Sequence, residues 1–129
     1  MSGDEICLTL PANEAFHGVA HLVLGGLAAR LDVTYEDLQD LELALDTLLE
    51  RLNGDRDMTL VVHIDDGSVR AVVGPFRSLR AELEAEGGNS LDLRRILAAV
   101  CDGVQVEDRD GSQWVELTKA IHTGARDGG

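Results

Sequence analysis

Residues 34–52 read TYEDLQDLELALDTLLERL, and leucines recur along this stretch at intervals of three and four. That spacing predicts an amphipathic helix, because residues three or four apart share one helix face. Thr34 with Asp37 resembles a capping box in which Asp replaces Glu, so we expect the helix to begin there. We place acidic residues on the opposite face. The predicted core stripe is Leu38, Leu41, Leu45, Leu48, Leu49 and Leu52.

Two elements precede this helix. Residues 5–10 alternate apolar and polar side chains, which predicts a half-buried edge strand that Pro11 ends. Residues 13–31 show helical spacing of apolar residues, but the stretch contains three glycines, which lower helix propensity. We therefore expect close packing to hold this helix. The glycines are Gly18, Gly25 and Gly26.

Five further elements follow. Residues 58–64 and 68–73 are β-branched runs joined by a turn sequence, which predicts a hairpin. Ser90 is expected to cap a helix that runs to about Cys101, and residues 104–107 and 113–118 predict a second hairpin. The order β-α-α-β-β-α-β-β predicts an α+β, two-layer sandwich, a mainly antiparallel sheet with helices on one face. We expect a single domain over 1–129, with residues 123–129 frayed.

Composition narrows the function classes. The chain has 129 residues and 44% hydrophobic residues, enough for one core. Eleven Lys and Arg against 24 Asp and Glu give a net charge of −13, the wrong sign for nucleic acid or an anionic membrane. The acidic surface either attracts a basic protein or serves only solubility.

The cysteines and histidines indicate the compartment of the protein and whether it binds a metal. Cys7 and Cys101 lie in apolar segments without C-x-x-C spacing, so we interpret them as reduced core residues of a cytoplasmic protein. No basic leader and no apolar run of about 20 residues is present. The four histidines lack metal-ligand spacing, so we expect no metal. They are His17, His21, His63 and His122.

Three segments give the chain a family resemblance. Leu10-Pro11-Ala12, LGGLAARL at 24–31 and TYEDLQDL at 34–41, in the element order above, resemble bacterial anti-sigma factor serine kinases. These kinases belong to the GHKL superfamily, with a Bergerat (histidine-kinase-like ATPase) fold. The resemblance is close over about residues 6–49 and weaker to Leu117, and it implies the same fold for this chain.

The resemblance also marks where nucleotide and metal contacts would lie. The family's catalytic Glu and its Mg²⁺-binding Asn align with Thr47 and Arg51, neither of which has a carboxylate or a metal-binding oxygen of the required kind. Asp46 or Glu50 could substitute only if the helix shifted by one residue. That shift would turn the leucine stripe out of the core.

Two further nucleotide motifs are missing. The adenine-binding Asp-x-Gly aligns its Asp with Gly74 and its Gly with Phe76, which either fills part of the former pocket or packs in the core. The glycines of the phosphate-binding lid align with Leu91 and Leu93. The resemblance therefore implies a degenerate member that binds no nucleotide cofactor and is not an enzyme.

We expect a non-catalytic protein-binding regulator whose partner is a sigma factor or an anti-sigma antagonist. In the related kinases the first strand and first helix help form a homodimer, which here implies the Ile6–Leu10 strand and the helix around His21. His21 aligns with an Arg that contacts the sigma factor in those kinases, and it is otherwise an ordinary surface histidine. Two alternatives remain open: an active ATP-dependent serine kinase with divergent motifs, and a small-ligand sensor that reuses the nucleotide cavity.

Overall fold

The computed structural model describes residues 4–11, 13–30, 33–52, 57–65, 67–77 and 93–121. The elements follow the predicted order, with one short 3₁₀ helix added before the first α-helix. They are β1 (Asp4–Pro11), η1 (Glu14–Phe16), α1 (His17–Arg30), α2 (Tyr35–Leu49), β2 (Asp57–Asp65), β3 (Ser68–Phe76), α4 (Leu93–Val100), β4 (Gly103–Arg109) and β5 (Ser112–Ala120).

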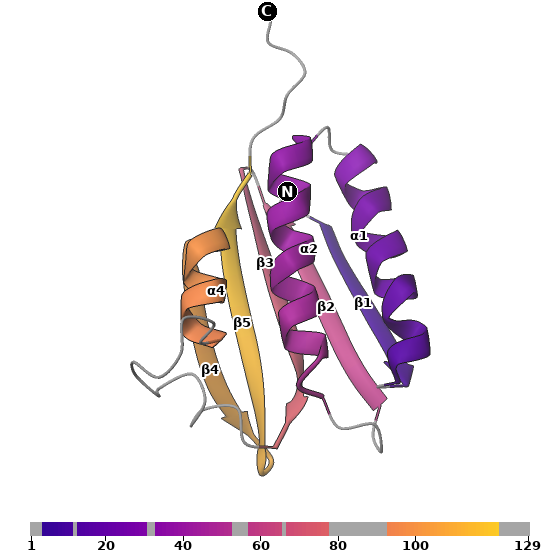
Figure 1. The fold of residues 1–129 in the computed structure, drawn as a ribbon, viewed down its shortest axis with the longest axis vertical. Helices are drawn as coiled ribbons and strands as arrows, with labels where there is room; N and C mark the ends of the chain where they lie inside the picture. Colours follow the sequence, from indigo (N-terminus) through magenta and orange to yellow (C-terminus); the bar gives the residue numbers. More distant parts are fainter. Residues whose placement is uncertain are drawn as a thin grey trace, which may run out of the picture.

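The strands form one five-stranded sheet in the order β1-β2-β3-β5-β4, and all four neighbouring pairs are antiparallel. The helices α1, α2 and α4 lie side by side across one face of this sheet (Figure 1). The predicted fold class is therefore confirmed. The prediction that the first strand lies at an edge is also confirmed, because β1 pairs only with β2 in the described sheet.

The hairpins close through residues that tolerate a left-handed backbone. Asp110 and Gly111 have φ values of 51° and 81° between β4 and β5, and Gly67 has a φ of 81° before β3. A two-residue turn with positive φ at both positions matches the natural twist of the paired strands. The turn sequences therefore fix the registers that place the sheet's side chains.

The core lies between the helices and the sheet. The N-cap is as predicted, because the Asp37 backbone N–H donates to Thr34 Oγ1 at 3.3 Å. The leucine stripe of α2 faces the sheet, with Leu48 fully buried, and alternate residues of β3 and β5 meet it. The most buried strand residues of this layer are Leu60, Val62, Val73 and Val115.

The packing of α1 is made by its buried residues Ala20, Leu24 and Ala28 rather than at its glycines, and the expectation that Cys7 is a core residue is wrong. A Cβ added to Gly18, Gly25 or Gly26 would meet nothing within 4 Å, so close packing within the described chain does not require these glycines. They lie on the half-exposed and outward sides of α1, away from the sheet. Cys7 is exposed rather than buried, because it lies on the side of β1 that faces away from the helices, whereas Cys101 is buried as predicted. Ser90 and residues 123–129 lie outside the described residues.

Candidate functional site

Thr47, which the resemblance aligns with the family's catalytic carboxylate, is turned inward. Thr47 is 6% exposed, and its hydroxyl donates a hydrogen bond to the Leu43 carbonyl, one turn earlier, at 2.7 Å. Arg51 Nη1 donates to the Thr47 carbonyl at 2.8 Å, and the guanidinium lies 3.8 Å from Glu50. A hydroxyl satisfied by its own helix, beside a cation, offers neither a general base nor a metal ligand.

The two neighbouring carboxylates do not replace it. Asp46 points toward α1 and accepts a hydrogen bond from His21 Nε2 at 2.6 Å, while the Glu50 side chain is 70% exposed. The helix is therefore in the register that buries the leucine stripe. A one-residue shift, the condition for either carboxylate to take the catalytic position, is not adopted.

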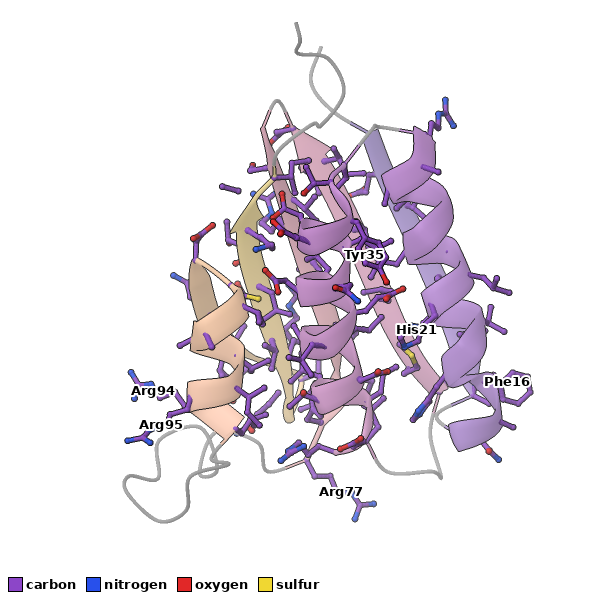
Figure 2. The ribbon with its side chains drawn as sticks, turned by 45° about the horizontal axis from the view of Figure 1, so that its top comes forward. Phe16, His21, Tyr35, Arg77, Arg94 and Arg95 are labelled. Atoms are coloured by element: carbon purple, nitrogen blue, oxygen red, sulfur yellow. The ribbon has the colours of Figure 1, made fainter. Side chains whose placement is uncertain are left out.

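His21 links α1 to α2 and is not a freely exposed surface residue, which corrects that expectation. Its side chain is 30% exposed and lies between Asp46 and Glu42, with its Nδ1 3.4 Å from Glu42 Oε2 (Figure 2). The hydrogen bond with Asp46 raises the pKa of His21, against the opposing effect of burial, and Glu42 adds to the rise. The protonated imidazolium can donate from both ring nitrogens to these two carboxylates.

Gly74, which the resemblance aligns with the adenine-binding Asp, packs against an aromatic ring on the side of the sheet that faces away from the helices. A Cβ on Gly74 would lie 2.5 Å from Trp114 Cδ2, so no larger residue fits there unless the ring moves. Phe76 is 2% exposed and Leu93 is fully buried, and both belong to the hydrophobic core. Phe76 therefore packs in the core, which is one of the two alternatives that the sequence left open. Leu91 lies outside the described residues.

The two cavities described between the helices and the sheet are small. Two apolar hollows there, both bordered by Leu24 and Leu41, have volumes of about 20 Å³ each. A single water needs at least about 10–15 Å³, so neither hollow could take a nucleotide or a metabolite.

A buried lysine that the sequence analysis missed joins three elements. Lys119 of β5 is 9% exposed, and its ammonium lies 3.2 Å from Asp40, 3.6 Å from Asp37 and 3.1 Å from the Val100 carbonyl. Burial lowers the pKa of Lys119, but the ion pairs outweigh it and the pKa is raised. The alternation of β5 indicated an inward position at 119, but not which carboxylates would lie there.

Most acidic side chains of α2 thus form ion pairs within the chain. Asp37 and Asp40 face Lys119, and Glu42 and Asp46 face His21. Exposed arginines gather elsewhere: Arg94 and Arg95 begin α4, and Arg77 follows β3 (Figure 2). The predicted acidic face is therefore narrower than the sequence indicated.

The outward side of α1 is apolar instead. Leu22 is 76% exposed, and Gly18, Gly26 and Ala29 also face solvent. The helix contains no acidic residue. A helix that is apolar on all sides is typically buried on all sides. No element of the described chain covers the outward side of α1.

Two negative findings concern the described residues only. No group of three or more His, Cys, Asp or Glu side chains is placed there to hold a metal ion. No helix in this part is long and apolar enough to cross a membrane.

Comparisons with known proteins show which proteins the chain resembles. No family model matches the chain. A stretch of 42 residues is 40% identical to the serine-protein kinase RsbW of Halalkalibacterium halodurans and covers 33% of this chain and 26% of that protein. The chain resembles RsbW.

The fold agrees with that resemblance. A crystal structure of the RsbU and RsbW domains of a Mycobacterium tuberculosis protein superposes with a TM-score of 0.70 and 17% identity, over 92% of this chain and 32% of that one. The predicted resemblance to anti-sigma factor kinases, with their GHKL-type fold, is therefore confirmed. The chain spans about a quarter to a third of the two proteins it matches.

Proposed function

We propose that this chain is a regulatory domain that binds a protein partner, as RsbW-like proteins would in partner-switching regulation, and that it transfers no phosphoryl group. The observation that carries the proposal is Thr47: its hydroxyl donates to its own helix at the position where the kinases need a carboxylate. Arg51, Gly74, Phe76 and Leu93 support it, because each occupies a nucleotide-contact position without the chemistry that the contact needs.

The binding surface we propose is the outward side of α1. The exposed Leu22 offers an apolar contact. Gly18 and Gly26 on either side of it have no Cβ, so another backbone can approach the helix closely there. Apolar contacts of this kind supply affinity, and the net charge of −13 favours a basic partner and raises its association rate. A sigma factor or an anti-sigma antagonist is the proposed partner class. His21 lies at the inner border of this surface.

A homodimer and a cytoplasmic location complete the proposal. The contact that we propose between copies is formed by the Ile6–Leu10 strand and the helix around His21. Both lie at the same side of the molecule, where β1 is the sheet edge beneath α1 (Figure 1).

The partner surface is tested by Leu22→Glu against Ala98→Glu, which adds the same charge at an exposed position of α4. Tagged wild type and both variants are used to retrieve proteins from the native host, followed by mass spectrometry. We expect Leu22→Glu to lose a partner that wild type and Ala98→Glu both retain. If Leu22→Glu retrieves the same partners in equal amounts, the α1 surface is wrong.

The non-catalytic part is tested on that captured partner. The complex is incubated with radiolabelled ATP and Mg²⁺, and we expect no label on the partner. Label that appears with wild type and disappears in a Thr47→Ala variant would support the kinase alternative instead.

A further inference from the structure

The side chain of His21 joins α1 to α2. The buried residues of α1 are only two alanines and one leucine, whereas α2 buries four leucines. Small side chains remove little apolar surface from water, so apolar contacts hold α1 less firmly than α2. A polar contact between the two helices therefore has a larger share in fixing where α1 lies. His21 makes such a contact, because its ring lies between Asp46 and Glu42 (Figure 2).

Both ring nitrogens of His21 face a carboxylate. Nε2 lies 2.6 Å from Asp46 Oδ1, and Nδ1 lies 3.4 Å from Glu42 Oε2. A neutral imidazole has one N–H donor and one lone pair, so it can donate to only one of these carboxylates and turns its lone pair toward the other. The protonated ring donates to both. The geometry therefore fits the charged form, and the hydrogen bond with Asp46 raises the pKa of His21 in agreement with it.

In the described chain, the charged groups that face His21 come from α2. Glu50, one turn beyond Asp46, has a side chain that is 70% exposed. Glu5 of β1 lies on the other side of the sheet, and His17, one turn earlier on α1, forms no ion pair with a described residue. The two facing carboxylates lie one helical turn apart, and like charges at that spacing repel each other unless a cation lies between them.

We infer that protonation of His21 controls how firmly α1 is held against α2. The protonated ring bridges the two carboxylates and keeps α1 in its described position. The folded-state pKa of His21 is raised, so the bridge is complete below the unfolded-state pKa and is lost as pH rises through the folded-state pKa. One hydrogen bond then becomes a repulsive contact, and α1 leaves its position more often.

The consequence for binding rests on the proposed partner surface. Leu22 lies on the outward side of the same helix, so a partner that binds there recognises α1 in its described position. The apparent affinity of a ligand falls with the fraction of the protein in the state that it binds. Partner binding should therefore be tighter below the folded-state pKa of His21 than above it, and histidine is the side chain whose charge changes near neutral pH.

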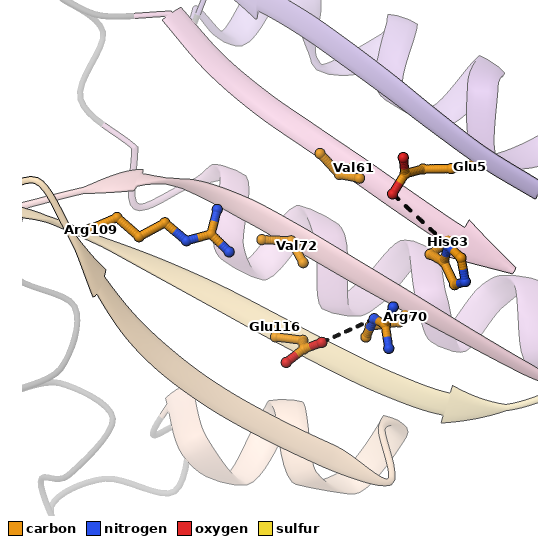
Figure 3. A pocket seen from close by; sticks show the side chains of 7 residues that line it. All are labelled: Glu5, Val61, His63, Arg70, Val72, Arg109 and Glu116. Atoms are coloured by element: carbon orange, nitrogen blue, oxygen red, sulfur yellow. Dashed lines mark ion pairs between the residues drawn. The ribbon is translucent and has the colours of Figure 1, made fainter.

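His63 offers a matched control on the other side of the sheet. This side, the open face, is not covered by any described element (Figure 1), and a groove of about 310 Å³ runs along it over Val61 and Val72 (Figure 3). His63 lines the groove and also lies between two carboxylates, with Nε2 3.2 Å from Asp65 and Nδ1 3.9 Å from Glu5. It joins strands that are already paired with each other, so its charge should leave α1 unaffected.

The experiment is amide hydrogen exchange on the full chain between about pH 5 and 8, corrected for the pH dependence of exchange in an unstructured chain, for wild type, His21→Gln, His21→Arg and His63→Gln. In wild type we expect the protection of α1 to fall about two- to fivefold as pH rises, the range that a partly exposed ion pair allows. His21→Gln should show the lower protection at every pH. His21→Arg should show the higher one, because a guanidinium stays charged and can donate to both carboxylates. His63→Gln should behave as wild type, and circular dichroism confirms that each variant is folded.

Protection of α1 that does not change with pH in wild type overturns the inference, and so does a fall that persists in His21→Gln. The proposed function is judged separately, by partner retrieval with Leu22→Glu. In the same retrieval at about pH 6 and about pH 8, wild type should retain less partner at the higher pH, while His21→Arg should retain equal amounts at both. Equal retention by wild type, with exchange as expected, would overturn the control of the partner surface.

Discussion

Val72 and Val73 are neighbours in β3, yet they lie in opposite environments. Val73 is fully buried between the sheet and the helices, and Val72 lines the groove on the open face and is half-exposed. The helix-covered face is filled by hydrophobic side chains, whereas the open face mixes valine, tryptophan and paired charges. The covered face therefore contributes more to stability than the open face.

The largest expected effect comes from shortening the two valines separately. Val73→Ala should lower the free energy of unfolding by about 2–3 kcal/mol, because two buried methyl groups and the cavity they leave both cost stability. Val72→Ala should cost less than about 1 kcal/mol, since its side chain already contacts water. Chemical denaturation of both variants measures the difference, and equal losses would mean that the open face is also part of the core.

Much of this contrast is predictable from the sequence. The two-residue period of the strands and the leucine stripe of α2 predict the element order, because these patterns are local. The single layer of helices and the edge position of β1 follow only when that order is combined with general rules of how helices pack on sheets. The pattern does not tell which glycines are packed. Gly18, Gly25 and Gly26 lie in open space on α1, while Gly74 packs against the Trp114 ring.

The candidate site divides in the same way. The resemblance located Thr47, Arg51, Gly74, Phe76 and Leu93, but the sequence could not show that Thr47 bonds to its own helix or that Phe76 is core. The sequence also could not predict which polar side chains pair over long distances in the chain. The ion pairs of Lys119 with α2 and of His21 with Asp46 join residues far apart in the chain, and only the packing of the elements brings them together.

A second contrast compares two glycines. Gly74→Ala should destabilise the fold by about 1–3 kcal/mol, because the added methyl group overlaps the Trp114 ring and strains its packing. Gly26→Ala should raise stability by about 0.5–1 kcal/mol, since it lies in the exposed middle of α1 with open space around it. Thermal unfolding of the two variants gives the signs. A destabilised Gly26→Ala would mean that the outer side of α1 is already covered.

The smallest effect is the pH dependence of the link between α1 and α2. The folded-state pKa of His21 is raised above 6.5, so its pairing with Asp46 contributes stability that is fully present below the unfolded-state pKa and is lost as pH rises through the folded-state pKa. The loss should be under about 1 kcal/mol, because the pair is partly exposed. Wild type is compared with His21→Asn by denaturation at pH values on either side of 6.5. We expect the stability difference between them to shrink as pH rises, and a difference that grows would contradict the assignment.

The central claim is that this RsbW-like chain keeps the fold of the kinases without their nucleotide chemistry. Isothermal titration with Mg·ATP tests it most directly, because binding must precede any phosphoryl transfer. With Thr47, Arg51, Gly74 and Phe76 at the contact positions, we predict no saturable heat up to millimolar ATP. Saturable heat with a micromolar dissociation constant would contradict the account and make the active kinase the better reading of the chain.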